Sequence, residues 1–360
     1  YNPTLYYGNV DTLLSNTGLL APSSVIGIDR NAPTPTVYSF TLGIQQNVGF
    51  GTVLDIAYVG NLGRHLAQVR NINLVPYGAR FLPQNADPAT PSVPLNDNFF
   101  RPYMGYGNIN YYENASTSNY NALQVSAKRR FMRMVQFGVS YTWSKAMDYA
   151  DADESAIATY RPIRIWNYGK SGFDQTHVFT ADYYWDLPKG SRIAGKASRF
   201  LLDDWQISGV TSFVSGMPNG ISMSLVDGAD LSGGGDGTRP LVLGKAQLGF
   251  DDRTFARFFD PTVFGRPAVG DPGNAPKDVF RGPGIANWDM SLFKKFPVMS
   301  EQRYFQFRWE LYNAFNHTQF ATVDNAARFD AAGHQVNSRL GQVTSTRTPR
   351  VMQFSLRFAF

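Results

Sequence analysis

The sequence of 360 residues contains no cysteine, which excludes disulfide frameworks and thiolate metal sites. Charged residues are also scarce: they make up 17% of the chain, against roughly 25% in average soluble domains. No stretch approaches the roughly 20 apolar residues of a membrane-spanning helix, and the mean hydropathy is -0.27. The sequence has no G-x-S-x-G elbow, no H-E-x-x-H pair and no phosphate-binding loop. We therefore expect neither an enzyme nor a bound cofactor, and we assign no catalytic residue.

Aromatic residues, by contrast, are abundant: they form 14% of the chain, with 27 Phe, 19 Tyr and 6 Trp. The formal net charge is +5, from 33 basic and 28 acidic residues. The one tight basic cluster, at 128–130, falls at the end of an expected strand, and no nucleic-acid recognition motif accompanies it. The composition thus indicates an aromatic-rich protein with no nucleic-acid partner.

In the last ten residues, every second position is apolar and most of the positions between them are polar. Phe354, Leu356, Phe358 and Phe360 lie on one parity. Gln353, Ser355 and Arg357 lie on the other parity. Successive side chains of a strand point to opposite faces, so this segment predicts one apolar and one polar face. An aromatic edge strand invites aggregation in a soluble sheet. In an outer-membrane barrel the same face contacts lipid, which is the location that the segment favours.

The same period of two recurs along the chain. It is cleanest at 135–144, where Val135, Phe137 and Val139 alternate with Gln136 and other polar or small residues. The alternation predicts nine strands, at 36–47, 52–59, 119–130, 135–144, 176–187, 205–215, 288–296, 305–311 and 351–360.

The connections between these strands alternate between short and long. The long ones are rich in Gly, Pro, Asn and Asp, as in GADLSGGGDGTRP at 228–240, and such composition is typical of loops. Transmembrane barrels have short periplasmic turns and longer extracellular loops. We therefore predict an all-β, antiparallel transmembrane β-barrel, present here as a partial barrel of about nine or ten strands with long extracellular loops.

Six stretches, in this order, resemble the barrel of TonB-dependent outer-membrane transporters, specifically the Oar-like subgroup. They are VLDIAYVGNLGRHL (53–66), FDQTHVFTADYYWDLPKG (173–190), DDWQISGVTSFVSGMP (203–218), RGPGIANWDMSLFKKF (281–296), FQFRWELYNAFNHTQF (305–320) and the terminal strand. The resemblance implies that residues 1–360 are the C-terminal part of a large plugged barrel of about 22 strands. Residues 1–35 are then expected to be an extracellular loop, and the plug and the first half of the barrel are absent from this sequence.

The resemblance also implies a location and partners. The location is the bacterial outer membrane, with its lipid and lipopolysaccharide. The partners are the barrel-assembly machinery, the TonB complex acting through the missing plug region, and an unknown extracellular ligand. Phe354, Leu356, Phe358 and Phe360 correspond to the terminal signal that the assembly machinery recognises.

Two groups of charged residues are candidate sites. Asp182, Asp186, Arg308 and Glu310 fall on polar strand parities and are expected to face the barrel lumen, in generic polar roles or in contact with a plug or substrate. Asp227, Asp230 and Asp236 are weak calcium candidates, because calcium prefers oxygen ligands, although EF-hand spacing is missing. A solvated extracellular loop is the alternative for them.

The predicted function is that of a barrel segment of a TonB-dependent, Oar-like receptor for active uptake or export across the outer membrane. A passive porin or structural envelope barrel shares the alternation but not the six stretches. A secreted β-rich glycan-binding protein or glycan-active enzyme is a second alternative, in which aromatics line a sugar cleft. The enzyme needs paired carboxylates that converge in a groove, and the sequence gives no such pairing.

Overall fold

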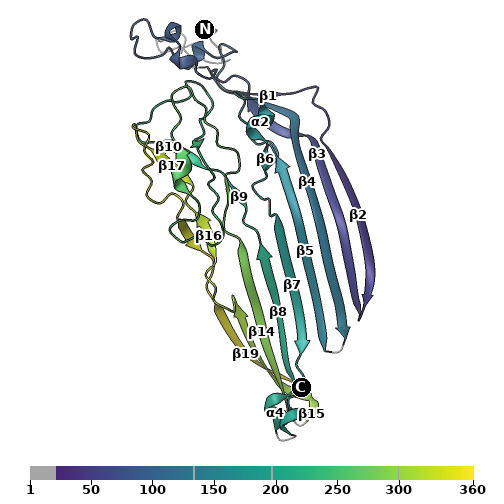
Figure 1. Ribbon diagram of the computed structural model, residues 1–360. Helices are drawn as coiled ribbons and strands as arrows, with labels where there is room; N and C mark the ends of the chain where they lie inside the picture. Colours follow the sequence, from purple (N-terminus) through teal and green to yellow (C-terminus); the bar gives the residue numbers. More distant parts are fainter. Residues whose placement is uncertain (1–21, 133, 196–197, 299) are drawn as a thin grey trace, which may run out of the picture.

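The computed structural model describes residues 22–132, 134–195, 198–298 and 300–360. Its main feature is a tall, curved sheet of eleven strands (Figure 1). Nine long strands follow one another across this sheet in chain order, and each is antiparallel to its neighbours. They are β2 (Thr36–Gly49), β3 (Thr52–Asn71), β4 (Ile109–Met132), β5 (Val135–Asp148), β7 (His177–Asp186), β8 (Trp205–Val214), β14 (Ile285–Val298), β15 (Ser300–Tyr312) and β19 (Val351–Ala359).

All nine predicted strands are confirmed, but β3 and β4 are much longer than their alternation predicted. β3 continues from Val59 to Asn71, and β4 begins at Ile109 rather than 119; the two remain paired throughout. A transmembrane strand needs only about 9–11 residues. The 24 residues of β4 therefore extend beyond a bilayer, and outside it neither face must be apolar.

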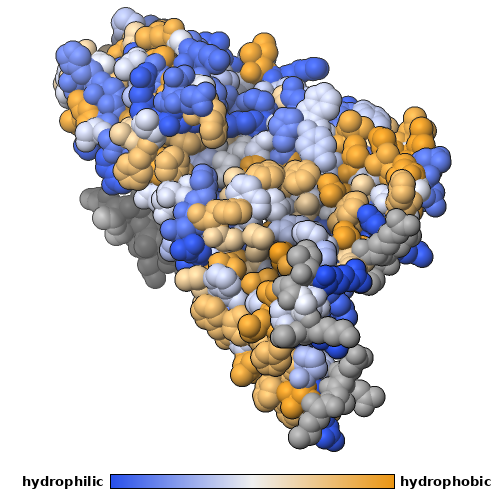
Figure 2. All heavy atoms as spheres, turned by 60° about the horizontal axis from the view of Figure 1, so that its bottom comes forward, coloured by the Kyte–Doolittle hydropathy of each residue, from blue (hydrophilic) through white to orange (hydrophobic). Residues whose placement is uncertain are grey.

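The pairing register collects side chains of one kind on each face of the sheet. One row joins Val135, Trp185, Ile207, Leu292, Trp309 and Phe354 across six strands. The row beside it, on the opposite face, joins Gln136, Tyr184, Ser208, Ser291, Glu310 and Gln353. We call these the apolar face and the polar face. Figure 2 shows hydrophobic residues gathered over the strands and more hydrophilic ones towards one end.

That hydrophilic end, the loop end, carries the long connections. Its short elements are β1 (Val25–Ile28), β6 (Gly169–Lys170), β9 (Pro218–Asn219), β10 (Ser222–Leu225), β11 (Leu241–Val242), β12 (Phe264–Gly265), β13 (Phe280–Arg281), β16 (Phe320–Val323), β17 (Ala326–Phe329), β18 (Val343–Thr346), α2 (Ile163–Asn167), η1 (Ala79–Phe81), η2 (Pro83–Asn85), η3 (Asp97–Phe99) and η5 (Pro261–Val263). β1 lies within the segment expected to be only a loop, and it pairs in parallel with β4. Residues 1–21 lie outside the described residues.

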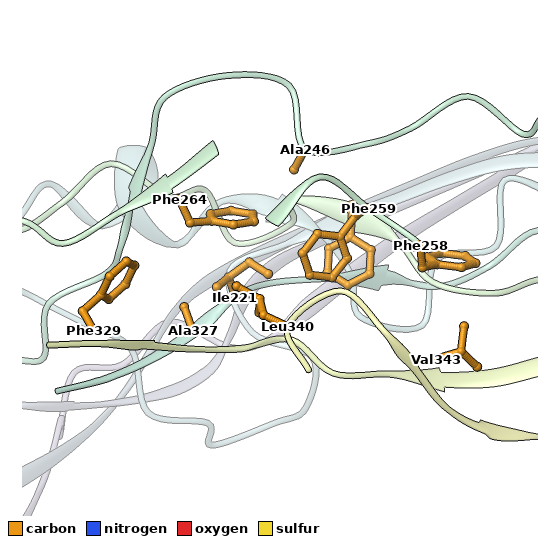
Figure 3. Packing of buried hydrophobic residues seen from close by; sticks show 10 residues of the cluster. Ile221, Ala246, Phe258, Phe259, Phe264, Ala327, Phe329, Leu340 and Val343 are labelled. Carbon is orange, nitrogen blue, oxygen red and sulfur yellow. The ribbon is translucent and has the colours of Figure 1, made fainter. Parts of the chain in front are cut away.

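The connections β8–β14 and β15–β19 pack together, which their loop-like composition did not predict. We call residues 215–284 and 313–350 the loop cap. β10 pairs with β17 across the two connections. The cap encloses a core of Ile221, Ala246, Phe258, Phe259, Phe264, Phe280, Ala327, Phe329, Leu340 and Val343 (Figure 3). Phe259 is fully buried and lies 4.3 Å from Phe280 between ring centroids. Phenylalanines that lie far apart in the sequence thus pack into one core, and this core holds the long connections in an ordered structure.

The opposite end of the sheet, the turn end, has short connections at β2–β3, β4–β5 and β14–β15. The β7–β8 connection is the exception at this end. It holds two short helices, α3 (Ser191–Ala194) and α4 (Arg199–Leu202), close to the C-terminus (Figure 1). In the described part of the chain, no helix is long and apolar enough to cross a membrane.

Candidate functional site

The polar face carries the four residues expected to face the lumen. The register places Asp182 and Asp186 on β7, and Arg308 and Glu310 on β15, all on this face. Arg308 forms an ion pair with Glu310, and its guanidinium lies 4.8 Å from the Phe293 ring centroid. These contacts show that the wall is charged. The functional roles of the four side chains remain predictions.

A recess of about 300 Å³ lies in this wall, between β7 and β15. The polar side chains that line it are Gln136, Asp182, Tyr184, Ser208, Asp289, Ser291, Glu310 and Tyr312. Asp289 was not singled out from the sequence, although it alternates with apolar Trp288 and Met290. Its carboxylate accepts hydrogen bonds from Asn287 Nδ2 and the Asn313 backbone N–H, both at 2.9 Å.

Glycine opposite Asp182 leaves the space that the carboxylate occupies. The two residues are cross-strand partners, and a Cβ at Gly138 would lie 2.5 Å from Asp182 Oδ1. Any larger side chain would displace the carboxylate from the wall. The Gly138–Asp182 pair therefore fixes where this negative charge is presented.

A second, larger pocket of about 740 Å³ opens at the loop end. Four tyrosines line it together with Arg70 and Asp236, namely Tyr77, Tyr103, Tyr111 and Tyr160. Tyr77 stacks on Tyr160 at 4.9 Å between ring centroids. The Tyr160 hydroxyl is buried without a hydrogen-bond partner among the described residues, and burial raises the pKa of this phenol. No period along the sequence identifies this pocket, because its residues come from the ends of β3 and β4 and from three different connections.

The calcium candidates are not brought together. Asp227 pairs with Arg266 at 2.8 Å and Asp230 with Arg80 at 2.7 Å, while Asp236 accepts the backbone N–H groups of Thr159 and Tyr160. Among the described residues, no group of three His, Cys, Asp or Glu side chains is placed to hold a metal ion. Asp230 and Asp236 instead connect separate loops, while Asp227 is paired within its own connection.

Ion pairs join the loop cap to the other connections. Arg80 bridges Asp230 of the cap and Asp97 at 2.6 Å, and its hydrogen bond lowers the pKa of the Asp97 carboxyl. Lys277 of the cap contacts Asp148 and Asp151 at 2.5 and 2.9 Å.

The pair with the most buried carboxylate is Arg281 with Asp174, at 2.5 Å; the Asp174 side chain is inaccessible to solvent. It connects the cap to the start of β7, and Asp174 also accepts the backbone N–H of Ala146. The long connections are therefore held as one ordered assembly above the sheet.

The four terminal residues expected to form an assembly signal lie at the sheet edge. Phe354, Leu356 and Phe358 belong to β19 and are exposed on the apolar face, and Phe360 follows the strand at 94% exposure. Phe354 stacks on Trp309 at 5.7 Å, and Phe358 lies 4.9 Å from Phe305 between ring centroids. In the described residues, no strand pairs with the outer edge of β19 or of β2.

Comparisons with known proteins agree with this architecture. A family model described as an outer membrane beta barrel domain matches residues 2–353. No curated protein matches the chain.

The solved structures that are similar to this chain include the three that follow. The outer membrane transporter YddB from Escherichia coli is 10% identical, with a TM-score of 0.44 over 94% of this chain and 34% of that chain. The ferric-catecholate import receptor Fiu from E. coli K12 is 12% identical, with a TM-score of 0.41 over 91% and 28%. The FrpB iron transporter from Neisseria meningitidis is 11% identical, with a TM-score of 0.41 over 92% and 32%.

The chain spans about a third of the length of these structures. The matched family is one of outer-membrane barrels and not an enzyme family. With its antiparallel sheet, its lipid-compatible face and a family match over nearly its whole length, the chain belongs to the outer membrane beta barrel domain family of the bacterial outer membrane.

Proposed function

We propose that this chain is the barrel segment of a TonB-dependent, Oar-like receptor that moves a ligand actively across the outer membrane. The observation that carries the proposal is the pairing of an acid-bearing recess on the polar face with an ordered loop cap. In a barrel whose apolar face contacts lipid, the polar face lines the interior. The recess is then a surface against which a plug or a passing ligand is held.

The loop end would make the first contact with the ligand. Its tyrosine-lined pocket offers aromatic faces, one guanidinium and one carboxylate in a single hollow. Ligand sites combine apolar or aromatic walls with a few convergent polar groups. The ion pairs of Arg80, Lys277 and Arg281 keep the surrounding connections in place before binding, which lowers the ordering cost of capture.

A plug on the polar face distinguishes this function from that of a passive porin. Because the chain has no cysteine, Ser291→Cys places a single thiol in the recess. We expect a water-soluble maleimide to label it slowly in cells that lack TonB, and faster when TonB and the proton-motive force act on the protein.

Leu243→Cys in the loop cap, where Leu243 is 72% exposed, is the control and should be labelled equally in both strains. Equal, rapid labelling of Ser291→Cys with and without TonB would instead identify an open porin or a structural barrel. The secreted glycan-active alternative receives no support, because the matched family is an outer-membrane one.

A further inference from the structure

The β7–β8 connection, residues 187–204, is unlike the other connections at the turn end. The neighbouring turns contain only a few residues, whereas this one contains α3 and α4. Three basic side chains are exposed along it, at Lys189, Arg192 and Arg199. Lys189 and Arg199 lie close enough to the Asp203 carboxylate to interact with it electrostatically, but none of the three forms a direct ion pair in the part of the chain that the structure describes. We call the described residues of this connection, 187–195 and 198–204, the anchor segment.

α4 folds against the apolar face of the sheet. Trp205 and Lys294 are cross-strand partners on that face. The Trp205 indole N–H donates a hydrogen bond to the Leu201 carbonyl at 2.7 Å, and the Lys294 ammonium donates one to the Asp203 carbonyl. Both bonds hold the C-terminal end of α4 to the outside of the barrel rather than beneath its lumen.

Aromatic contacts continue the apolar face into the anchor segment. Phe200 lies 5.1 Å from Phe296 between ring centroids. Phe296 is the cross-strand partner of Phe305, which in turn pairs with Phe358. The aromatic row that ends the lipid-facing band therefore runs without interruption onto α4.

Lys294 shows that this contact is built into the fold. It is a charged residue on the lipid-facing parity, yet its side chain is only 1% exposed. Its ammonium lies 5.0 Å from the Phe296 ring and 5.7 Å from the Trp205 ring, and it binds the Asp203 carbonyl. The ammonium is thus covered by the anchor segment and kept away from lipid. The Asp203 carboxylate also accepts the Ser191 N–H and hydroxyl at 2.9 and 2.6 Å, which ties α3 to the same place.

The outer surface of α4 remains apolar. Phe200, Leu201 and Leu202 are 59%, 65% and 43% exposed. A short segment that combines exposed apolar residues with Lys and Arg is typical of an interfacial anchor, in which the apolar side chains enter the acyl boundary and the cations meet anionic headgroups. Aromatic residues such as Trp205 favour the same depth.

We propose that the anchor segment is a membrane-binding element that lies in the interface at the turn end of the barrel. Phe200 and Leu201 insert beside the acyl chains, and Lys189, Arg192 and Arg199 bind the phosphate groups of anionic phospholipid. The occupant of this surface is lipid because the surface is continuous with the lipid-facing band of a transmembrane barrel and is positively charged at its rim. This binding is independent of whether the protein transports a ligand.

The test uses a spin label at Leu201→Cys, the only thiol in the chain, in protein purified from outer membranes. The protein is placed in nanodiscs of phosphatidylcholine, with or without phosphatidylglycerol. With the anionic lipid, we expect oxygen to relax the label more than a water-soluble nickel complex does. We also expect thiol labelling of unmodified Leu201→Cys to slow by about tenfold or more relative to phosphatidylcholine alone.

Two variants separate the charge effect from general unfolding. One variant combines Lys189→Gln, Arg192→Gln and Arg199→Gln. In this variant, the lipid exposure and thiol labelling of Leu201→Cys should be the same in the two nanodisc compositions. The matched control replaces three exposed loop-cap residues by Gln, namely Lys245, Arg328 and Arg347. This control should leave the difference between the two nanodisc compositions unchanged. Nickel access to Leu201→Cys equal to that at Leu243→Cys would overturn the proposal. Lipid exposure that is the same in both nanodiscs would overturn the headgroup binding.

Discussion

At the scale of single residues, parity decides which substitutions the sheet tolerates. Val139 lies midway between Val135 and Trp143 on the apolar face of β5, and Ser140 follows it on the polar face. Arg on the lipid face at the bilayer midplane costs about 2–4 kcal/mol. We therefore expect Val139→Arg to destabilise the barrel by that amount in lipid.

Ser140→Arg is the matched control, because its cross-strand neighbours are Ser126 and Thr180 on the polar face. It should change the free energy of unfolding in lipid by much less than Val139→Arg. Denaturant titration of both variants in the same bilayer measures the difference. Equal tolerance would mean that the two faces have been assigned wrongly.

The buried pair of Asp174 and Arg281 makes a second prediction at this scale. Asp174→Ala removes the carboxylate that accepts hydrogen bonds from the Arg281 guanidinium and from the Ala146 N–H. Breaking a buried ion pair by removing one partner costs about 3–5 kcal/mol. Hydrogen exchange in the loop cap should therefore rise strongly, with little change in the strands near the turn end.

The contrast is Arg257→Ala at the exposed pair with Asp260, where Arg257 is 53% exposed. Exposed ion pairs contribute about 0–1 kcal/mol, so cap exchange should change little. If the two variants had the same small effect, the Asp174–Arg281 pair would not hold the connections together.

At the scale of elements, the sequence predicted strands well and their ends poorly. Period-two alternation identifies β5 and β19 because one face must satisfy lipid and the other water. The outer halves of β3 and β4 extend beyond the roughly 9–11 residues that a bilayer needs, so no lipid-facing parity constrains them, and Asn61 and Arg64 continue a strand without any alternation. The loop cap was missed for another reason: Phe259 and Phe329 are distant in sequence, and only tertiary packing makes them one core.

Tags inserted into single elements test the orientation of the barrel. The turn at 331–334 in the loop cap ends in His334, whose side chain is 77% exposed. A tag inserted after Gly333 should be accessible to antibody on intact cells, because long barrel loops are extracellular. A tag after Gly51, in the β2–β3 turn, should react only after the outer membrane is opened. The reverse pattern would invert the predicted topology.

At the scale of the whole molecule, the candidate residues were predictable only in part. The polar parity of Asp182 and Glu310 follows from their own strands, but the recess between them exists because the register places Ser208 and Ser291 in the same row as Glu310. The tyrosine pocket and the anchor segment depend on contacts between distant connections, for which a single sequence contains no period. Pairing of strands in chain order, by contrast, followed directly from the alternation of short and long connections.

The terminal strand connects this architecture to its assembly. β19 presents an unpaired edge in the described sheet, and Phe354 and Phe358 lie exposed on its apolar face. We propose that the barrel-assembly machinery recognises this strand by strand addition, in which backbone pairing gives affinity and alternate side chains give specificity. The combined variant Phe354→Ala, Phe358→Ala should then reduce outer-membrane insertion sharply, as should loss of Phe360. Gln353→Ala with Ser355→Ala, on the polar face of the same strand, should insert normally. Heat-modifiable mobility of the membrane-extracted protein measures insertion, and equal insertion of both double variants would show that β19 is only a strand of the wall.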